Sequence, residues 1–476
     1  MHNEISEVWS FAKFEDQVAL VDEFGNSVSY AELEIESNRL ATFVPRRSLV
    51  FTLCENKIGA VIGYVGFLKN QIPLALLSSN LEEELLDELL DKYHPQYLWS
   101  PDEMKYHFHD MEIVYEAYGY VLRKSAYRDI HHIHEDLALL LTTSGSTGSP
   151  KFVRQSYANI RSNTDSIIEY LGLNSSERPI TTLPMNYTYG LSIINTHLAV
   201  GATILLTDKT LMHKEFWQFF KEQNATSFGG VPYTYEMLDK LRFWRMDLPS
   251  LRTMTQAGGK LTTELHEKFA KYAAETGMNF VVMYGQCEAT ARMGYLPAEK
   301  AVAKKGSMGI AIPGGRFQLI DTDGNEITTP YTTGELVYEG ANVTLGYAEC
   351  ADDLAKGDEW HGVLKTGDMA QFDEDGFFYI VGRKKRFLKI YGNRVNLDEV
   401  DRLIKGKFEV EVACAGIDDH MYIFLMDESV HDEVKKYVVK TTKLNPAAIK
   451  VVVIDEIPKN DSGKTRYTDL EKYYDV

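Results

Sequence analysis

The segment Leu140-Leu-Thr-Thr-Ser-Gly-Ser-Thr-Gly-Ser-Pro-Lys151 carries the strongest structural signal in the sequence. Its first residues are apolar and read as a buried strand, and they run directly into serines, threonines and glycines. Glycines let successive backbone N–H groups approach an anion, hydroxyls add donors, and Lys151 adds positive charge. The segment therefore predicts a loop that binds a polyphosphate. The alternative, a flexible Gly/Ser linker, is not normally preceded by a buried strand or closed by Pro-Lys.

This loop is not a P-loop of the Walker A type, which requires the pattern GxxxxGK[ST]. The only GKT in the chain is Gly463-Lys464-Thr465, and the position five residues before Gly463 is Pro458 instead of glycine. The sequence therefore excludes a P-loop nucleotide hydrolase.

Strand-like and helix-like segments alternate on both sides of the loop. Such alternation is typical of βαβ units around a parallel sheet, so an α/β fold is expected. Strands are predicted over Ser48–Thr52, Ile72–Leu77 and Tyr97–Trp99, and helices over Lys57–Lys69 and Leu81–Lys92. The alternating pattern recurs over Arg161–Leu171, Gly201–Leu206, Phe216–Gln223 and Glu264–Thr276.

The pattern changes twice further along the chain. Residues 306–381 contain short strand-like segments and Asp-Gly turns, which indicates a β-rich subdomain. After Gly382 the sequence predicts a small α+β domain with strands over Val410–Ile417, Tyr422–Met426 and Ile449–Ile454 and a helix over His431–Lys443. We therefore expect a large N-terminal domain of residues 1–382, built of parallel-sheet α/β subdomains and the β-rich subdomain, and a C-terminal domain of residues 383–476.

Composition excludes several classes of protein. The 476 residues carry 50 Lys and Arg against 69 Asp and Glu, a formal charge of −19, which disfavours nucleic-acid binding. The start of the sequence lacks a basic segment followed by an apolar run, and no apolar stretch is long enough to span a membrane. Four widely spaced cysteines form no CxxC pair, so a cytoplasmic protein without disulfides or zinc is expected. The run Ile130-His-His-Ile-His-Glu fits no metal-ligand spacing and reads as a polar connector.

The chain resembles the adenylate-forming (ANL) superfamily, which comprises acyl-CoA synthetases, aryl acid ligases, peptide-synthetase adenylation domains and luciferases. The loop ending at Lys151 matches the phosphate-loop signature of that superfamily. Further matches follow in the expected order: Tyr284-Gly-Gln-Cys-Glu288 to YGxTE, Gly334-Glu-Leu-Val-Tyr-Glu-Gly340 with Gly346-Tyr347 to GELxxxG…GY, Thr366-Gly-Asp368 with Gly382-Arg383 to TGD…GR, Lys389-Ile-Tyr-Gly392 to KxxG, and Ile457-Pro-Lys-Asn-Asp-Ser-Gly-Lys464 to the C-terminal lysine motif.

The resemblance implies a role for each matched residue. Ser144, Thr147 and Lys151 would hold the β- and γ-phosphates of ATP, and Glu288 would hold Mg²⁺, a cation that prefers carboxylate oxygen. Asp368 would accept the ribose hydroxyls, supported by Arg383, and Lys464 would bridge the acid and the α-phosphate. Lys464, Glu288 and Thr147 are the expected catalytic residues. The expected nucleotide-binding residues are Thr143, Ser144, Gly145, Ser146, Thr147, Lys151, Gly259, Tyr284, Gly285, Cys287, Asp368 and Arg383.

Each of these residues also has a purely structural interpretation. Asp368 could cap a turn, Glu288 could be a surface acid, and Lys464 alone resembles any lysine in a polar turn. The resemblance implies a domain hinge at Lys385, where a solvated lysine is the alternative, and close approach of a pantetheine arm at Gly392.

The acid pocket is expected at Tyr187, Tyr189, Gly190 and Gly258. The segment Pro184-Met-Asn-Tyr-Thr-Tyr-Gly190 lacks the aspartate that binds the amine in members that activate amino acids, which disfavours an α-amino acid. Tyr187 and Tyr189 favour an apolar or aromatic-walled pocket, although Gly258-Gly259 could equally be a tight turn. Cys287 stands where relatives carry threonine or serine, and a thiol is a weaker donor than a hydroxyl.

The resemblance implies an enzyme that converts a small carboxylic acid to its acyl-adenylate with ATP and Mg²⁺ and then transfers the acyl group to a thiol. That thiol belongs to coenzyme A or to the phosphopantetheine of an acyl carrier protein, and the sequence does not choose between them. One alternative is an amine or hydroxyl acceptor. A second is a nucleotide-binding homologue without catalysis, for which Cys287 is the only support.

Overall fold

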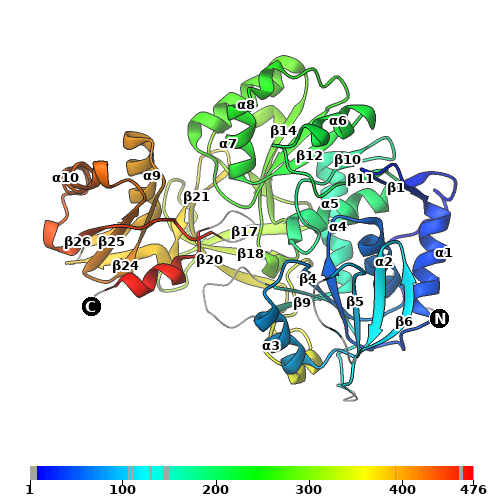
Figure 1. Ribbon diagram of the computed structural model, residues 1–476. Coiled ribbons are helices and arrows are strands. Elements are labelled where there is room, and N and C mark those ends of the chain that lie inside the picture. Colours follow the sequence, from blue (N-terminus) through cyan, green and yellow to red (C-terminus); the bar gives the residue numbers. More distant parts are fainter. Residues whose placement is uncertain are drawn as a thin grey trace. The chain divides into compact units, whose positions relative to one another are not determined.

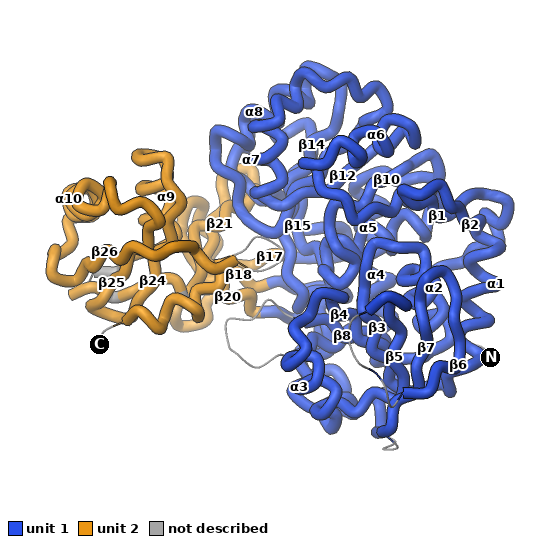
Figure 2. The backbone as a smooth tube through the Cα atoms, viewed as in Figure 1, with its two compact units in different colours: residues 1–143, 150–316, 338–364 blue, residues 144–149, 317–337, 365–476 orange. Residues whose placement is uncertain are grey.

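The computed structural model describes residues 8–104, 108, 111–127, 131–142, 151–391, 393–459 and 465–474, without the side chains of residues 385, 387, 389, 393 and 394. Contacts divide the chain into two compact units (Figure 2). The first includes the chain up to Thr143, Pro150–Arg316 and Tyr338–Leu364, and the second includes Phe317–Val337 and Lys365–Val476. These units are defined by contacts alone. The domain boundary between residues 382 and 383 that the sequence predicts stays a prediction.

The first unit contains an eight-stranded sheet whose centre is parallel. Strands β3, β4, β5 and β8 pair in parallel, and antiparallel strands extend both edges. The strands, in sheet order, are β19 (Tyr347–Ala348), β9 (Phe152–Ser156), β8 (Leu137–Thr142), β4 (Leu74–Ser78), β3 (Val50–Cys54), β5 (Tyr97–Pro101), β7 (Tyr120–Lys124) and β6 (Glu112–Ala117). The helices that accompany them are α1 (Tyr30–Ala41), α2 (Ile58–Lys69) and α3 (Glu83–Tyr93).

A second sheet of nine strands completes the first unit. Its strands, in order, are β16 (Ile310–Ala311), β15 (Gly294–Leu296), β14 (Asn279–Tyr284), β13 (Thr253–Gln256), β12 (Ser227–Gly230), β10 (Pro179–Ile180), β11 (Ile204–Leu206), β1 (Val18–Asp22) and β2 (Ser27–Ser29). Its helices are α4 (Tyr157–Leu171), α5 (Thr188–Ala199), α6 (Lys214–Glu222), α7 (Pro232–Lys240) and α8 (Thr263–Thr276). The run from β10 to β14 is parallel, which places the carboxyl ends of β12, β13 and β14 at one edge.

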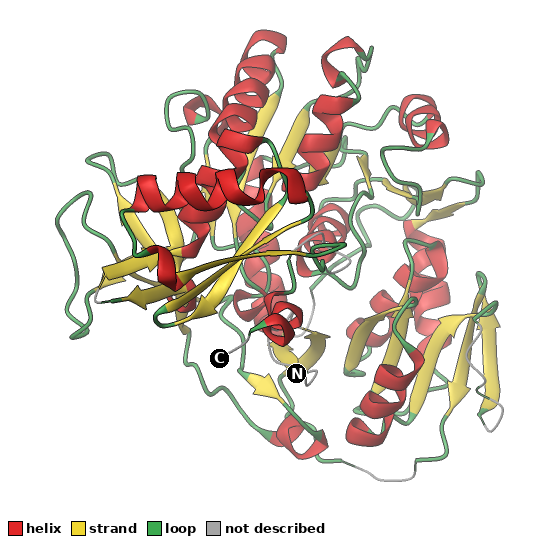
Figure 3. Cartoon of the chain, turned by 60° about the vertical axis from the view of Figure 1, so that its left-hand side comes forward, coloured by secondary structure: helices red, strands yellow, loops and turns green. Residues whose placement is uncertain are grey.

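Burial explains why these segments form helices and strands. Every residue of α2 from Ile58 to Leu68 is buried, so this helix is apolar on all sides and lies within the core. Helix α1 is amphipathic and begins at a capping box in which Ser29 and Glu32 satisfy each other's backbone N–H groups. Figures 1 and 3 show helices packed beside the strands of the sheets. None of the described helices has the length and apolar character needed to cross a bilayer.

The second unit carries the α+β part of the chain. Strands β17 (Gly315–Ile320), β18 (Gly334–Gly340), β20 (Val363–Phe372) and β21 (Phe378–Arg383) form a four-stranded sheet. The hairpin of β22 (Phe387–Ile390) and β23 (Asn393–Asn396) follows, and then a sheet of β24 (Val412–Ile417), β25 (His420–Leu425) and β26 (Ile449–Val453) with helices α9 (Leu397–Phe408) and α10 (His431–Thr442).

The predicted fold class is confirmed. The chain is mixed α/β, with parallel strands in its N-terminal sheets, a β-rich segment and an α+β C-terminal part. Predicted segments differ from the observed ones by a few residues at their ends; the strand predicted over Ser48–Thr52, for example, is Val50–Cys54. Strand and helix ends are the least determined part of any such prediction because end residues make few backbone hydrogen bonds.

Candidate active site

Strand β14 delivers the motif Tyr284-Gly-Gln-Cys-Glu288 to the carboxyl edge of the second sheet. The strand ends at Tyr284, and a single 3₁₀ turn, η3 (Cys287–Ala289), follows. A Cβ at Gly285 would lie 1.7 Å from the backbone oxygen of Ala291. Only glycine therefore lets the chain fold back tightly enough to present Glu288 after the strand.

Glu288 is held by a tyrosine from a distant segment. The Tyr347 hydroxyl donates a hydrogen bond to Glu288 Oε1 at 2.7 Å. Burial, followed by the negative charge of Glu288, raises the pKa of Tyr347 well above its ordinary value, so the phenol keeps its proton. The bond leaves Glu288 Oε2 available to a cation.

Lys151 lies over the same aromatic ring. Its ammonium nitrogen is 3.6 Å from the centroid of the Tyr347 ring, a cation–π contact. The backbone beside Tyr347 is fastened by the buried Arg154 of β9, whose Nε donates to Tyr347 O at 2.9 Å and whose Nη2 donates to Leu345 O at 2.8 Å. Tyr347 therefore contacts two charged side chains: Lys151, a cation that can bind phosphate, lies on its ring, and Glu288, a carboxylate that can bind a metal, accepts from its hydroxyl.

The backbone that follows Glu288 is strained. Thr290, a β-branched residue, has φ of 66° and ψ of −61°, a positive-φ conformation that such residues rarely adopt. Buried hydrogen bonds hold it: Thr290 Oγ1 donates to Asn342 O at 2.7 Å, and Gln155 Nε2 donates to Thr290 O at 3.3 Å. Strain maintained by surrounding contacts is common where side chains are positioned for function.

The residues predicted for the acid pocket lie together. Tyr187 and Tyr189 contact each other edge to face with ring centroids 6.3 Å apart, and the Tyr189 hydroxyl is 2.7 Å from Thr255 Oγ1 at the end of β13. Burial raises the pKa of Tyr189 to about 12. Gly258 has φ of 84°, and a Cβ there would lie 2.8 Å from the Tyr187 hydroxyl. The turn at Gly258 therefore packs directly against the tyrosine pair.

Two more predicted glycines, Gly190 of the acid-pocket set and Gly259 of the nucleotide-binding set, lie close to backbone and proline atoms. A Cβ at Gly190 would lie 2.3 Å from Pro184 O, so this glycine permits the first turn of α5 to pack on the preceding loop. A Cβ at Gly259 would lie 3.0 Å from Pro232 Cγ at the start of α7. Both positions shape the backbone around the tyrosines.

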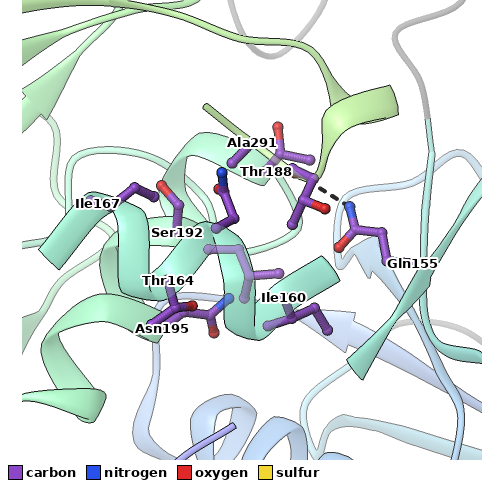
Figure 4. A pocket seen from close by; sticks show the side chains of 11 residues that line it. Gln155, Ile160, Thr164, Ile167, Thr188, Ser192, Asn195 and Ala291 are labelled. Atoms are coloured by element: carbon purple, nitrogen blue, oxygen red, sulfur yellow. Dashed lines mark hydrogen bonds between the residues drawn. The ribbon is translucent and has the colours of Figure 1, made fainter. Parts of the chain in front are cut away.

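Cys287 contacts the first residue of α5. Its thiol donates to Thr188 Oγ1 at 3.5 Å, a long contact that is ordinary for sulfur. Thr188 also lines a small polar cavity of about 10 Å³ between α4 and α5, the size of one water molecule (Figure 4). Figure 4 shows Thr164 of α4 and Ser192 and Asn195 of α5 around this cavity, and the dashed line marks the bond from Gln155 to Thr290 O.

Asp368 and Arg383 belong to the second unit, where they are cross-strand neighbours on β20 and β21. Arg383 Nε is 3.5 Å from Asp368 Oδ1, and the Asp368 N–H donates to Thr366 Oγ1 at 3.1 Å. Asp368 is buried, whereas the Arg383 side chain is 65% exposed. The pair thus consists of a buried carboxylate, Asp368, and a largely exposed guanidinium, Arg383.

Several predicted residues lie outside the described part of the chain. These are Thr143, Ser144, Gly145, Ser146, Thr147, Gly392 and Lys464, and the side chain of Lys385 is likewise not described. Within the described residues, no group of three or more His, Cys, Asp or Glu side chains is arranged to hold a metal. The histidines near residue 131 therefore give no metal site in the part that is described.

The sequence motifs did not assign three residues of this site. Tyr347 appears in the GELxxxG…GY element, but nothing in that pattern links it to Glu288. Thr188 lies within the predicted pocket segment and is a hydroxyl beside Cys287. Arg292, four residues after Glu288, is buried against Tyr189, and the only signal for it was a charged residue within an apolar segment.

Residues 8–348 match the family of AMP-binding enzymes, and the chain belongs to this family. Among curated proteins, the chain is 30% identical over 362 residues to a peroxisomal OPC-8:0-CoA ligase of Arabidopsis thaliana, an alignment that covers 71% of this chain and 64% of that protein. It is 28% identical over 338 residues to a 2-succinylbenzoate–CoA ligase of Bacillus pumilus, covering 69% and 67%. This chain therefore spans just under two thirds of the length of the OPC-8:0-CoA ligase.

Solved structures show the same fold over nearly the whole chain. O-succinylbenzoate coenzyme A synthetase from Bacillus subtilis, in complex with AMP, superposes with a TM-score of 0.80 at 22% identity and covers 97% of this chain and 96% of its own. MatB from Rhodopseudomonas palustris, bound to ATP, superposes with a TM-score of 0.77 at 21% identity and covers 99% and 98%.

Proposed function

We propose that this protein is an AMP-forming acid–thiol ligase. It binds ATP, Mg²⁺ and a small carboxylic acid, forms the acyl-adenylate and transfers the acyl group to a thiol. The observation that carries the proposal is the cluster of Lys151, Tyr347 and Glu288, which places a phosphate-binding cation and a metal-binding carboxylate on one ring. Membership of the AMP-binding enzyme family and CoA ligases among the relatives support it.

The proposed reaction has two steps, adenylation of the acid and transfer of the acyl group. A carboxylate oxygen of the acid attacks the α-phosphorus of ATP, the bond to the β-phosphate oxygen breaks, and pyrophosphate leaves. A thiolate sulfur then attacks the acyl carbon, and AMP leaves with the electron pair of the broken carbon–oxygen bond. Both steps bring anions together, so neutralising and positioning charge supply most of the catalysis.

The chain's residues fit these needs. Lys151 would neutralise phosphate charge, and the Tyr347 hydroxyl orients Glu288 through Oε1 and leaves Oε2 for a cation. Mg²⁺ bound at Glu288 would neutralise the phosphates of ATP. Tyr284 would lie against the adenine, and Asp368 would accept hydrogen bonds from the ribose. Ser144, Thr147 and Lys464 are proposed to contact the phosphates and the acid as the resemblance implies.

Coenzyme A is the first candidate for the thiol because relatives are named CoA ligases. A carrier-protein phosphopantetheine is the second. We further propose a cytoplasmic location and movement of residues 383–476 about a hinge at Lys385; one relative is peroxisomal by name. An amine or hydroxyl acceptor and a non-catalytic homologue are the alternatives to be tested.

ATP–pyrophosphate exchange over a panel of carboxylic acids tests the first step. Acid-dependent exchange supports the proposal, and silence across the panel while ATP still binds would favour the non-catalytic homologue. Measuring AMP release with coenzyme A, with a phosphopantetheinylated carrier protein and with neither then identifies the acceptor. Further arms with an amine and with an alcohol test the other alternative, which AMP release only in those arms would establish.

A further inference from the structure

Three arginines are buried among the described residues, and one of them differs from the other two. Arg154 pairs with Glu359, and Arg386 pairs with Asp401 and a second aspartate. Arg292 is only 3% exposed, yet within the described chain no carboxylate pairs with its guanidinium. Burying a charge without an opposite charge is costly, so this exception calls for a physical reason.

Neutral groups hold the Arg292 side chain in place. Its Nε donates to Ser192 Oγ at 3.1 Å, and its Nη1 donates to Tyr170 Oη at 3.2 Å. Its Cζ lies 5.2 Å from the centroid of the Tyr189 ring, a cation–π contact. These contacts use two of the guanidinium's N–H donors and leave the rest of the planar fork for another acceptor.

The position of Arg292 relates it to the proposed acid pocket. It follows Glu288 by four residues, on the far side of the strained Thr290, and its backbone carbonyl accepts a hydrogen bond from Asn163 Nδ2 at 2.8 Å. Its guanidinium faces Tyr189, the tyrosine predicted to line the pocket. The same strained loop therefore orients the proposed metal-binding carboxylate and a buried cation.

We propose that Arg292 binds a second carboxylate of the acid substrate, so that the enzyme's substrate class is a dicarboxylic acid. This inference rests on the proposed function. One carboxylate of the substrate is adenylated, and the other forms a two-pronged ion pair with the guanidinium, the geometry that arginine provides and lysine does not. The bound substrate then supplies the negative charge that the folded chain lacks at this point.

The test is acid-dependent ATP–pyrophosphate exchange with straight-chain dicarboxylic acids from malonate to suberate, each measured beside its monomethyl ester. The ester keeps the length and one carboxylate but removes the second charge. The wild type is expected to prefer at least one diacid over its ester by about tenfold or more in kcat/KM, as charged hydrogen bonds allow. The ratio is taken within one protein preparation, so a loss of folded protein cancels.

Two variants of Arg292 and one control variant test whether Arg292 causes the preference for the diacid over its ester. Arg292→Met should lower the diacid-to-ester ratio about 10- to 150-fold, and Arg292→Lys should lower it less because charge remains without the fork. Arg161→Met, which removes a half-exposed arginine of α4, should keep the wild-type ratio. A merely structural arginine would reduce exchange with diacid and ester equally.

Two results overturn the inference on their own: exchange with monocarboxylic acids and no diacid preference, or a diacid preference that Arg292→Met leaves intact. If no acid supports exchange while ATP still binds, the proposed function fails and this inference fails with it. The two kinds of failure therefore give different results.

Discussion

The Tyr347 hydroxyl donates a 2.7 Å hydrogen bond to Glu288 Oε1, although 59 positions separate the two residues in the chain. The bond fixes the orientation of the carboxylate proposed to hold Mg²⁺. Because the ring also receives Lys151 on its face, a single tyrosine positions both charges on which nucleotide binding is proposed to depend.

Tyr347→Phe should lower the affinity for Mg²⁺, so that exchange requires a higher Mg²⁺ concentration. Phenylalanine keeps the ring under Lys151 and removes only the hydroxyl, so Glu288 loses its orienting donor. Loss of such an outer contact typically costs about 10- to 100-fold in metal affinity or activity. A Mg²⁺ titration of ATP–pyrophosphate exchange should shift to higher Mg²⁺ by this order.

Tyr127→Phe is the matched control, because the Tyr127 hydroxyl also donates to a carboxylate, Asp91, at 2.7 Å, but in an exposed position. Its Mg²⁺ titration should coincide with that of the wild type. An unshifted curve for Tyr347→Phe would contradict the orienting role.

Gly285→Ala should destabilise the protein strongly. The new Cβ would lie 1.7 Å from Ala291 O, a backbone atom that cannot move without breaking the turn behind Glu288. The free energy of unfolding, measured by denaturant titration, should fall by about 2–3 kcal/mol or more. Gly406→Ala meets no atom within 4 Å on helix α9 and should instead stabilise by up to about 1 kcal/mol. Equal effects of the two substitutions would show that the close contact is not decisive.

Cys287→Ser tests the departure of this chain from the superfamily pattern. If Cys287 contacts the α-phosphate, a hydroxyl should do so better than the thiol, and exchange should rise by about 3- to 10-fold, the range of one net hydrogen bond. Cys287→Ala lacks a donor and should show no gain. A serine variant no faster than the alanine variant would rule out that contact.

The buried His197 predicts a specific pH dependence of stability. Its Nδ1 is 2.7 Å from Ile193 O, and burial lowers its pKa from 6.5 to about 4. Between these two values the unfolded chain binds a proton that the folded chain does not, so stability falls as pH drops from about 6.5 to 4. The neutral imidazole thus contributes fully above pH 6.5 and progressively less below it.

His197→Asn keeps a donor near Ile193 O and removes the titration. The difference in unfolding free energy between wild type and this variant should change across that window by about 3 kcal/mol, and by little above pH 7. Parallel stability profiles of the two proteins from pH 4 to 7 would contradict a neutral buried imidazole.

Much of the fold could be predicted because its signals are local. The apolar run of α2, the turn glycines and the order of the motifs each depend on neighbouring residues, and they indicated alternating strands and helices correctly. Segment ends were less accurate, as with the segment predicted from Arg161, which forms helix α4 and begins at Tyr157 because Ser156 and Asn159 form a capping box.

The site was predicted only in part because its decisive contacts join distant segments. Nothing near Glu288 in the sequence indicates that Tyr347 will donate to it, and nothing near Arg292 indicates that carboxylates will be absent around it. Such relationships depend on which strands become neighbours, so the structure was needed to show them. Gly190 and Gly285 were chosen as ligand contacts, and their close backbone approaches show a steric requirement that the motif alone does not reveal.

The most direct test of adenylation compares Lys464→Ala with wild type in ATP–pyrophosphate exchange and in ATP binding. Lys459→Ala is the control, because Lys459 lies five positions earlier and pairs with Glu411. We expect acid-dependent exchange in the wild type and in Lys459→Ala, and its loss in Lys464→Ala with ATP affinity nearly intact. Unchanged exchange in Lys464→Ala, or a wild type that binds ATP but exchanges pyrophosphate with no acid, would contradict the account.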